Sequence, residues 1–126
     1  GDIVQPAMEA LDHMGLAHRA HDDVMALAHG EHRQLELAMA LAMKPRLLLL
    51  DEPLAGMSQA ESATMIDLLK RLKGHYTILL VEHDMQAVFS LADRISVLVY
   101  GRAIACDTPS GIQRDEDVRR AYLGDE

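Results

Sequence analysis

The chain has 126 residues, of which 49% are hydrophobic and 25% charged, and its formal net charge is −8. This length allows one small domain with a single core, and the composition excludes disorder, collagen and a coiled coil as descriptions of the whole chain. The negative charge argues against broad nucleic-acid binding and against electrostatic attachment to anionic lipid, because both depend on basic side chains.

Cysteine content and hydropathy place further limits on the chain. Cys106 is the only cysteine, so no disulfide can form within the chain and a reducing compartment is expected. No segment approaches the ~20 consecutive apolar residues of a membrane span. The sequence begins Gly-Asp-Ile without Met, and we expect a processed chain or a piece of a longer one.

Hydrophobic periodicity predicts three helices, over residues 4–14, 31–43 and 59–73. Between them, the apolar runs 47–50 and 77–81 have the length of strands, and we expect parallel strands that are covered on both faces. The middle helix is apolar around much of its circumference, so we expect it to be largely buried. Its apolar residues are Leu35, Leu37, Ala38, Met39, Leu41 and Ala42.

The last third of the chain predicts an antiparallel hairpin of residues 95–100 and 102–106 around Gly101, followed by short helices from Thr108-Pro109 onward. Alternation of helices and strands before the hairpin predicts an α/β fold with a parallel sheet and right-handed crossovers. Ligands of such sheets bind beyond the carboxyl ends of the strands.

Ionisable side chains follow both predicted parallel strands. Asp51-Glu52 ends the first strand, and Glu82-His83-Asp84 ends the second. An acidic pair after a strand is most often a turn or a helix cap, but two such clusters on neighbouring strands favour a metal-assisted hydrolytic site. There, one carboxylate holds Mg²⁺, the other orients the attacking water, and the imidazole donates to a phosphoryl oxygen.

Four segments resemble the motifs of the ABC-type ATPases, in the order and at the spacing of that family. Residues 47–52 resemble the Walker B motif with its catalytic glutamate, and residues 27–43 resemble the signature motif and its helix. Residues 54–58 are similar to the D-loop, and residues 81–84 to the H-switch. The resemblance implies that residues 1–126 are the C-terminal part of a P-loop NTPase-like domain, an α/β parallel-sheet fold that ends in a hairpin and helices over 95–124.

The resemblance also implies residue roles. Asp51 is expected to organise Mg²⁺, Glu52 to act on the hydrolytic water, and His83 to contact the γ-phosphate of ATP. The signature residues are expected to face the ATP of the opposite subunit in a head-to-tail dimer, and Ser58 is expected to belong to the D-loop. The signature residues concerned are Ala28, His29, Gly30 and Glu31.

The chain departs from the family pattern at three positions. Ala28 stands where the family usually has Ser, so a hydroxyl donor to the γ-phosphate is missing, and His29 stands where Gly is usual. Ser58 stands where Asp is common, and its sequence context Ser58-x-x-Glu61 favours a helix N-cap over a catalytic role.

The phosphate-cradling loop G-x-x-x-x-G-K-[ST] is absent from the sequence, and none of the eight glycines is followed by Lys. The isolated chain is therefore expected to be inactive and not to bind ATP tightly. In the family, the strand of that loop lies between the H-switch strand and the hairpin. We therefore expect an unpaired edge on residues 77–81 and self-association or a swapped dimer through it.

The ending of the chain, including Thr108-Pro109 and residues 121–124, is closest to the ATPase subunits of importers for branched-chain amino acids and related amides such as urea. This resemblance implies a second ATP-binding subunit and transmembrane permease subunits as partners. It also implies a cytoplasmic, peripheral location on the inner face of the cell membrane.

Three alternatives remain at this point. One is a soluble, non-transport ABC ATPase, for which we would expect a basic, nucleic-acid-binding surface. The net charge of the chain does not favour such a surface. A non-catalytic metal-binding or dimerisation module would use the helical pairs His18/His21 and His29/His32 with His13, although a solvated His-rich surface explains them more simply. The third alternative is a regulatory half-domain without turnover.

Overall fold

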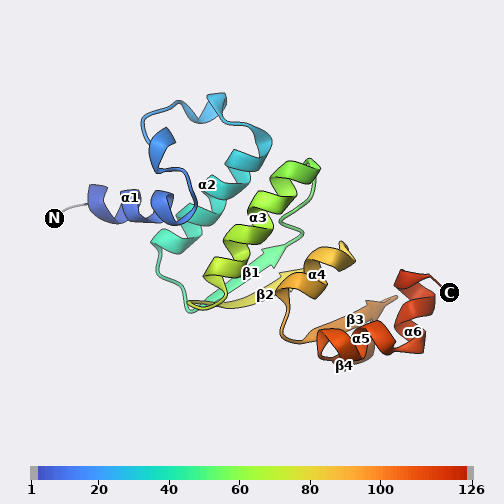
Figure 1. Cartoon of the computed structure of the whole chain (residues 1–126). Coiled ribbons are helices and arrows are strands. Elements are labelled where there is room, and N and C mark those ends of the chain that lie inside the picture. Colours follow the sequence, from blue (N-terminus) through green and yellow to red (C-terminus); the bar gives the residue numbers. More distant parts are fainter. Residues whose placement is uncertain (1–2, 125–126) are drawn as a thin grey trace. The chain divides into compact units, whose positions relative to one another are not determined.

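A computed structural model describes residues 3–124, which form two compact units: the first ends at Glu82 and the second begins at His83 (Figure 1). The prediction of one part-domain over residues 1–126 stays a prediction. The elements of the first unit are α1 (Val4–His13), η1 (Ala17–Arg19), η2 (Val24–Ala26), α2 (His29–Ala42), β1 (Leu47–Asp51), α3 (Gln59–Leu72) and β2 (Thr77–Val81).

The centre of the first unit is a β–α–β arrangement in which α3 connects two paired strands. β1 and β2 are parallel, with Leu47 opposite Thr77 and Asp51 opposite Val81, which confirms that the two apolar runs are neighbours. Ser58 caps α3, and the apolar face implied by the helical periodicity of residues 59–73 is buried. The buried residues of α3 are Met65, Leu68, Leu69 and Leu72.

One face of the β1–β2 pair is open, and the expectation that both strands are covered on both faces is wrong for the described residues. Leu47, Leu49, Leu79 and Val81 are each at least 50% exposed, whereas Leu48 is buried. Side chains alternate between the two faces of a strand, so every second apolar residue projects to the side away from the crossover helix. Within residues 3–124, β1 and β2 pair only with each other, which leaves each with an unpaired edge.

Helix α2 is less buried than its composition predicts. Leu37, Ala38 and Leu41 are buried, but Met39 is 64% exposed and Ala42 is also exposed. Helices α1 and α3 each pack against α2. These two neighbours cover part of its circumference, and the remaining apolar side chains face solvent.

The second unit contains the predicted hairpin. β3 (Ile95–Val99) and β4 (Arg102–Asp107) pair in antiparallel fashion through a turn at Tyr100–Gly101, where both residues have positive φ, as two-residue hairpin turns require. Its core is formed by Ile95, Val97, Ile112 and Val118. The unit's helical elements are α4 (Met85–Leu91), α5 (Pro109–Arg114), α6 (Glu116–Val118) and η3 (Arg119–Leu123).

The helices of the described residues 3–124 include none that is both long and apolar enough to cross a bilayer.

Truncation of the buried face of α3 is expected to cost most of the stability of the first unit. Leu68 is only 2% exposed, so Leu68→Ala removes apolar burial and leaves a cavity. We expect a loss of about 2–5 kcal/mol in the free energy of unfolding, measured by urea denaturation. The control Met39→Ala, at a position 64% exposed on α2, is expected to cost less than about 0.5 kcal/mol. Equal losses would contradict the assigned core.

Candidate functional site

The carboxyl ends of β1 and β2 are joined by a hydrogen bond just beyond the strands. Asp51 is the last residue of β1, and Glu52 follows it with φ +48°, in the left-handed region. This conformation costs a non-glycine residue roughly 1–2 kcal/mol. The N–H of Glu52 donates to the carbonyl oxygen of Val81 at 2.7 Å. Pairing with β2 therefore helps hold the turn that redirects the chain at Glu52.

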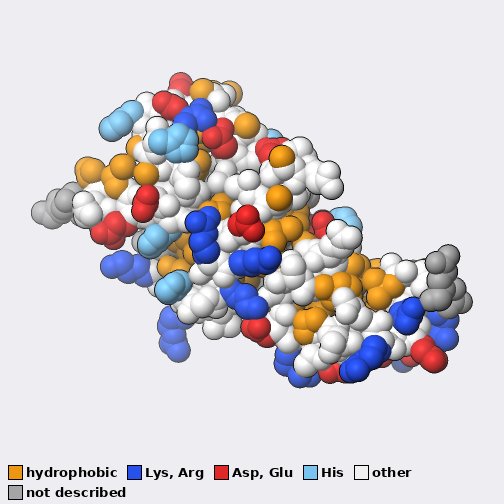
Figure 2. Space-filling view, in the orientation of Figure 1, with side chains coloured by type: hydrophobic (Ala, Val, Ile, Leu, Met, Phe, Trp, Pro, Cys, Tyr) orange, Lys and Arg blue, Asp and Glu red, His pale blue; other side chains and the backbone are white. Residues whose placement is uncertain are grey.

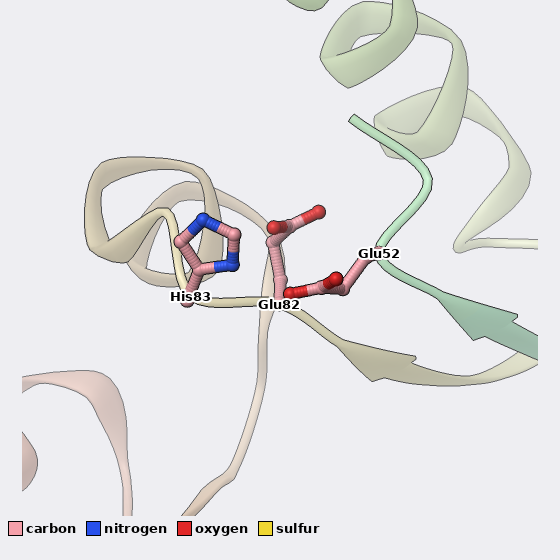
Figure 3. Close-up of side chains that lie close together, drawn as sticks. All are labelled: Glu52, Glu82 and His83. Carbon is pink, nitrogen blue, oxygen red and sulfur yellow. The ribbon is translucent and has the colours of Figure 1, made fainter. Parts of the chain in front are cut away.

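Glu82 fixes the same turn from the other strand. Its Oε2 accepts a hydrogen bond from the backbone N–H of Leu54 at 3.3 Å. The side chains of Glu52 and Glu82 lie close together, with His83 beside them as the next residue along the chain (Figure 3). One potential ligand atom from each of these three residues lies within 4.8 Å of the others.

Of these three side chains, the two carboxylates suit a hard divalent cation, whereas the imidazole suits an anion. Carboxylate oxygens such as those of Glu52 and Glu82 are the ligands that Mg²⁺ prefers, and an imidazole beside them can donate a hydrogen bond to an anion. Glu52 and Glu82 are half-buried and His83 is exposed, so the group is open to a ligand from solvent.

The sequence prediction for this group was incomplete. Glu52 and His83 come together as expected, but Asp51, the predicted Mg²⁺ residue, is exposed and is not a member of the group. Asp51 is the last residue of β1, whereas Glu52 lies beyond the strand in a left-handed turn, so the backbone presents these two consecutive carboxylates differently. The sequence places Glu82 in the second ionisable cluster but assigns it no role of its own.

The N-terminus of α2 carries the predicted signature residues. Ala28 is the N-cap, and its backbone N–H donates to Oε1 of Glu31 at 3.0 Å. Oε2 of Glu31 accepts from Nη1 of Arg19 at 2.7 Å. The N–H of Ala28, and then the guanidinium of Arg19, lower the pKa of Glu31 below its ordinary value. Glu31 therefore stabilises the start of α2.

Two contacts tie this helix end to the segment after β1. The N–H of Gly30 donates to Oε2 of Glu61 at 2.6 Å, and Nε2 of His29 lies 3.1 Å from the carbonyl oxygen of Ala55. A cavity of about 250 Å³ lies between the first turns of α2 and α3, beside Gly30 and Glu61. The predicted signature and D-loop segments are therefore in direct contact within one unit.

Ser58 has the predicted structural role. Its Oγ accepts from the N–H of Glu61 at 3.1 Å, and Oε1 of Glu61 accepts from the N–H of Ser58 at 3.1 Å. This reciprocal pair confirms the capping box that the sequence predicted. A D-loop role for Ser58 toward nucleotide stays a prediction.

The histidines of the first unit do not form a ligand set in the described part of the chain. Among residues 3–124, the only group of three or more potential ligand side chains is Glu52, Glu82 and His83. On the face shown in Figure 2, histidine side chains are scattered rather than gathered. The alternative of a metal module built from the pairs His18/His21 and His29/His32 with His13 therefore gains no support.

Two sequence families match the chain. The family described as ABC transporter matches residues 2–55, and the family described as branched-chain amino acid ATP-binding cassette transporter matches residues 104–126. The high-affinity branched-chain amino acid transport ATP-binding protein LivG of Escherichia coli K12 is 41% identical over 117 residues, covering 91% of this chain and 46% of LivG. The chain is similar to the ATP-binding domains of ABC transporters over most of its length.

Other similar ABC proteins transport the same solute class as LivG or a different one. The branched-chain amino acid protein BraF of Pseudomonas aeruginosa is 36% identical over 126 residues, covering 98% of this chain and 49% of BraF. The aliphatic sulfonates import protein SsuB of Burkholderia thailandensis is 44% identical over 110 residues, covering 86% of this chain and 32% of SsuB. The chain spans about half the length of the branched-chain amino acid relatives that it matches.

Solved ABC cassettes share the fold. MJ1267, an ATP-binding cassette of an ABC transporter, aligns with a TM-score of 0.83 and 25% identity over 96% of this chain and 50% of its own. A nucleotide-free cassette aligns with a TM-score of 0.84 and 25% identity over 97% of this chain and 50% of its own. The chain is thus a partial P-loop NTPase-like α/β fold, as the sequence predicted.

Acid is expected to weaken the start of α2 through Glu31. Because folding lowers its pKa, Glu31 contributes stability above its ordinary pKa of 4.5, and this contribution is lost as pH falls through the lower folded value. We expect Glu31→Gln to reduce the fall in urea midpoint between about pH 6 and about pH 3. Glu36→Gln, at an exposed position of the same helix, is the control. An unchanged pH dependence in Glu31→Gln would contradict the assigned role.

Proposed function

We propose that this chain is the hydrolytic and partner-facing part of the ATP-hydrolysing subunit of an importer. The observation that carries the proposal is the parallel pairing of β1 and β2, which brings Asp51-Glu52 and Glu82-His83 to one end of the same sheet. Similarity to ABC transporter ATP-binding proteins supports ATP as the nucleotide. LivG and BraF are branched-chain amino acid transport proteins, which supports that solute class here, and a related amide such as urea is proposed only from the resemblance of the chain's ending.

Within the proposed mechanism each side chain has one task. Asp51, at the end of β1 and outside the group of Glu52, Glu82 and His83, would hold Mg²⁺ directly or through water, and the ion would neutralise charge on the phosphates. Glu52 orients the attacking water and accepts a proton from it. His83 donates a hydrogen bond to the γ-phosphate, where negative charge develops. The contact between Glu82 and the N–H of Leu54 supports this arrangement by fixing the turn after Glu52.

Nucleotide binding in this proposal needs two further components. The phosphate-cradling loop, which the sequence lacks, comes from another part of the subunit. A second ATP-binding subunit packs head to tail, so that the signature segment 28–31 and the D-loop around Ser58 face the ATP of the opposite subunit. Amides at a helix N-terminus suit an anion there, because they are unpaired within the helix and carry the positive end of its dipole.

The assembly also includes transmembrane permease subunits, at the cytoplasmic face of the cell membrane, and no nucleic acid. The absence of a membrane-crossing helix among residues 3–124 is compatible with a peripheral position. ATP-driven closure of the two ATP-binding subunits moves the permease.

The mechanism is tested by substituting the proposed base. Mixed with a half-domain that carries a phosphate loop, the chain is expected to hydrolyse ATP, and Glu52→Gln is expected to lower the rate by about 10²–10⁴-fold without loss of nucleotide affinity. Phosphate release is the measurement. Asp67→Asn, an exposed carboxylate on α3, is the matched control.

Two outcomes would contradict this proposal. One is a Glu52→Gln mixture as active as the unsubstituted one. The other is a micromolar Kd for ATP in calorimetry of the chain alone, because such affinity would require a phosphate grip within these residues.

Self-association through the open side of the β1–β2 pair is also proposed. The unpaired edge of β2 and the exposed Leu79 on the open face support it, since such surfaces recruit further strands. Light scattering is expected to give a mass above that of a monomer at high concentration. Leu79→Lys is expected to reduce it, whereas Leu98→Lys, at an exposed position in the second unit, is not. A monomer at every concentration contradicts the proposal.

A further inference from the structure

Helix α2 lacks the usual side-chain cap at its N-terminus. Ala28 is the N-cap, and a Ser, Thr, Asn or Asp at this position would accept a hydrogen bond from the second or third helical N–H. Ala28 has no side-chain oxygen, so the N–H of Gly30, at the second helical position, needs an acceptor from elsewhere.

Glu61 supplies that acceptor from a different helix. Its Oε2 accepts from the N–H of Gly30 at 2.6 Å, while its Oε1 accepts from the N–H of Ser58 at 3.1 Å. One carboxylate therefore caps both α2 and α3. A Cβ at position 30 would lie 2.4 Å from Oε2 of Glu61, so the absence of a side chain at Gly30 permits this approach.

The hydrogen-bond donors and the charge around Glu61 favour the ionised form of its carboxylate. The N–H groups of Ser58 and then Gly30 lower its pKa, and His29, on α2, acts in the same direction when protonated. Glu31 is the other carboxylate at this end of α2, and its Oε2 is engaged by Arg19. At neutral pH the N–H of Gly30 thus faces a negative charge that belongs to the chain itself.

We propose that Glu61 is a positioning residue that occupies the amide of Gly30 until a phosphate group displaces it. The inference rests on the proposed function, which assigns the signature segment to the nucleotide of the opposite subunit. A carboxylate and a phosphate require the same N–H and repel each other, so they cannot occupy it together. Glu61 thereby links engagement of that phosphate to the cap of α3 that follows the D-loop.

The test uses the 126-residue chain, labelled with ¹⁵N, with inorganic phosphate as the probe. In the unsubstituted chain, the amide signals of Gly30 and Ser58 are expected to titrate together with acid, with a midpoint below 4.5. Glu61→Gln is expected to abolish this shared titration and to strengthen the phosphate response of the Gly30 amide by about two- to fivefold. Asp67→Asn, on the same helix, is the matched control and is expected to change neither.

Ala28→Ser provides a second variant that retains a cap. Its hydroxyl can accept from the start of α2 locally, so the titration of the Gly30 amide is expected to shrink while that of Ser58 persists. This variant restores the missing helix cap, and it therefore tests the contact without removing the capping box of α3.

The inference is overturned if the Gly30 amide titrates in Glu61→Gln as in the unsubstituted chain. It is also overturned if the two proteins respond equally to phosphate or if neither responds. Failure of the proposed function would give a different result. The mixture with a phosphate-loop half-domain would not hydrolyse ATP, whereas the amides of Gly30 and Ser58 would still titrate together.

Discussion

The candidate site depends on parallel hydrogen bonding between β1 and β2. Parallel pairing brings the carboxyl ends of both strands to one edge, and the register sets Asp51 opposite Val81. The bond from the N–H of Glu52 to the carbonyl of Val81 then holds the left-handed turn that sends Glu52 toward Glu82. Without this pairing, two acidic segments 30 residues apart in the chain would have no common location.

A second constraint operates at the helix N-termini. Every helix begins with N–H groups that lack partners within the helix, and at the start of α2 carboxylates accept from two of these groups, in place of a side chain at the N-cap. The carboxylate of Glu31 accepts a hydrogen bond from the N–H of Ala28, and that of Glu61 accepts one from the N–H of Gly30. The contact between Glu61 and the N–H of Gly30 thus joins two segments that the proposed function assigns to the same subunit interface.

The sequence was a good guide where local patterns decide the outcome. The capping box at Ser58, the buried stripe of α3 and the turn at Gly101 follow from a few neighbouring residues, and all were predicted. Coverage of apolar surface was predicted poorly, as exposed Met39 and Leu49 demonstrate. Burial depends on which elements pack over a face, and hydrophobicity alone does not specify that.

By itself, the sequence determined the resemblance to ABC ATPases, the α/β class, the order of the motifs and the segments that carry ionisable residues, because residue identity and spacing encode these directly. Only the tertiary structure decided that Glu82 joins Glu52 and His83 while Asp51 does not, and that Glu61 reaches Gly30. Those outcomes depend on side-chain direction at a strand end and on the approach of two helices, which arise from packing between elements distant in the chain.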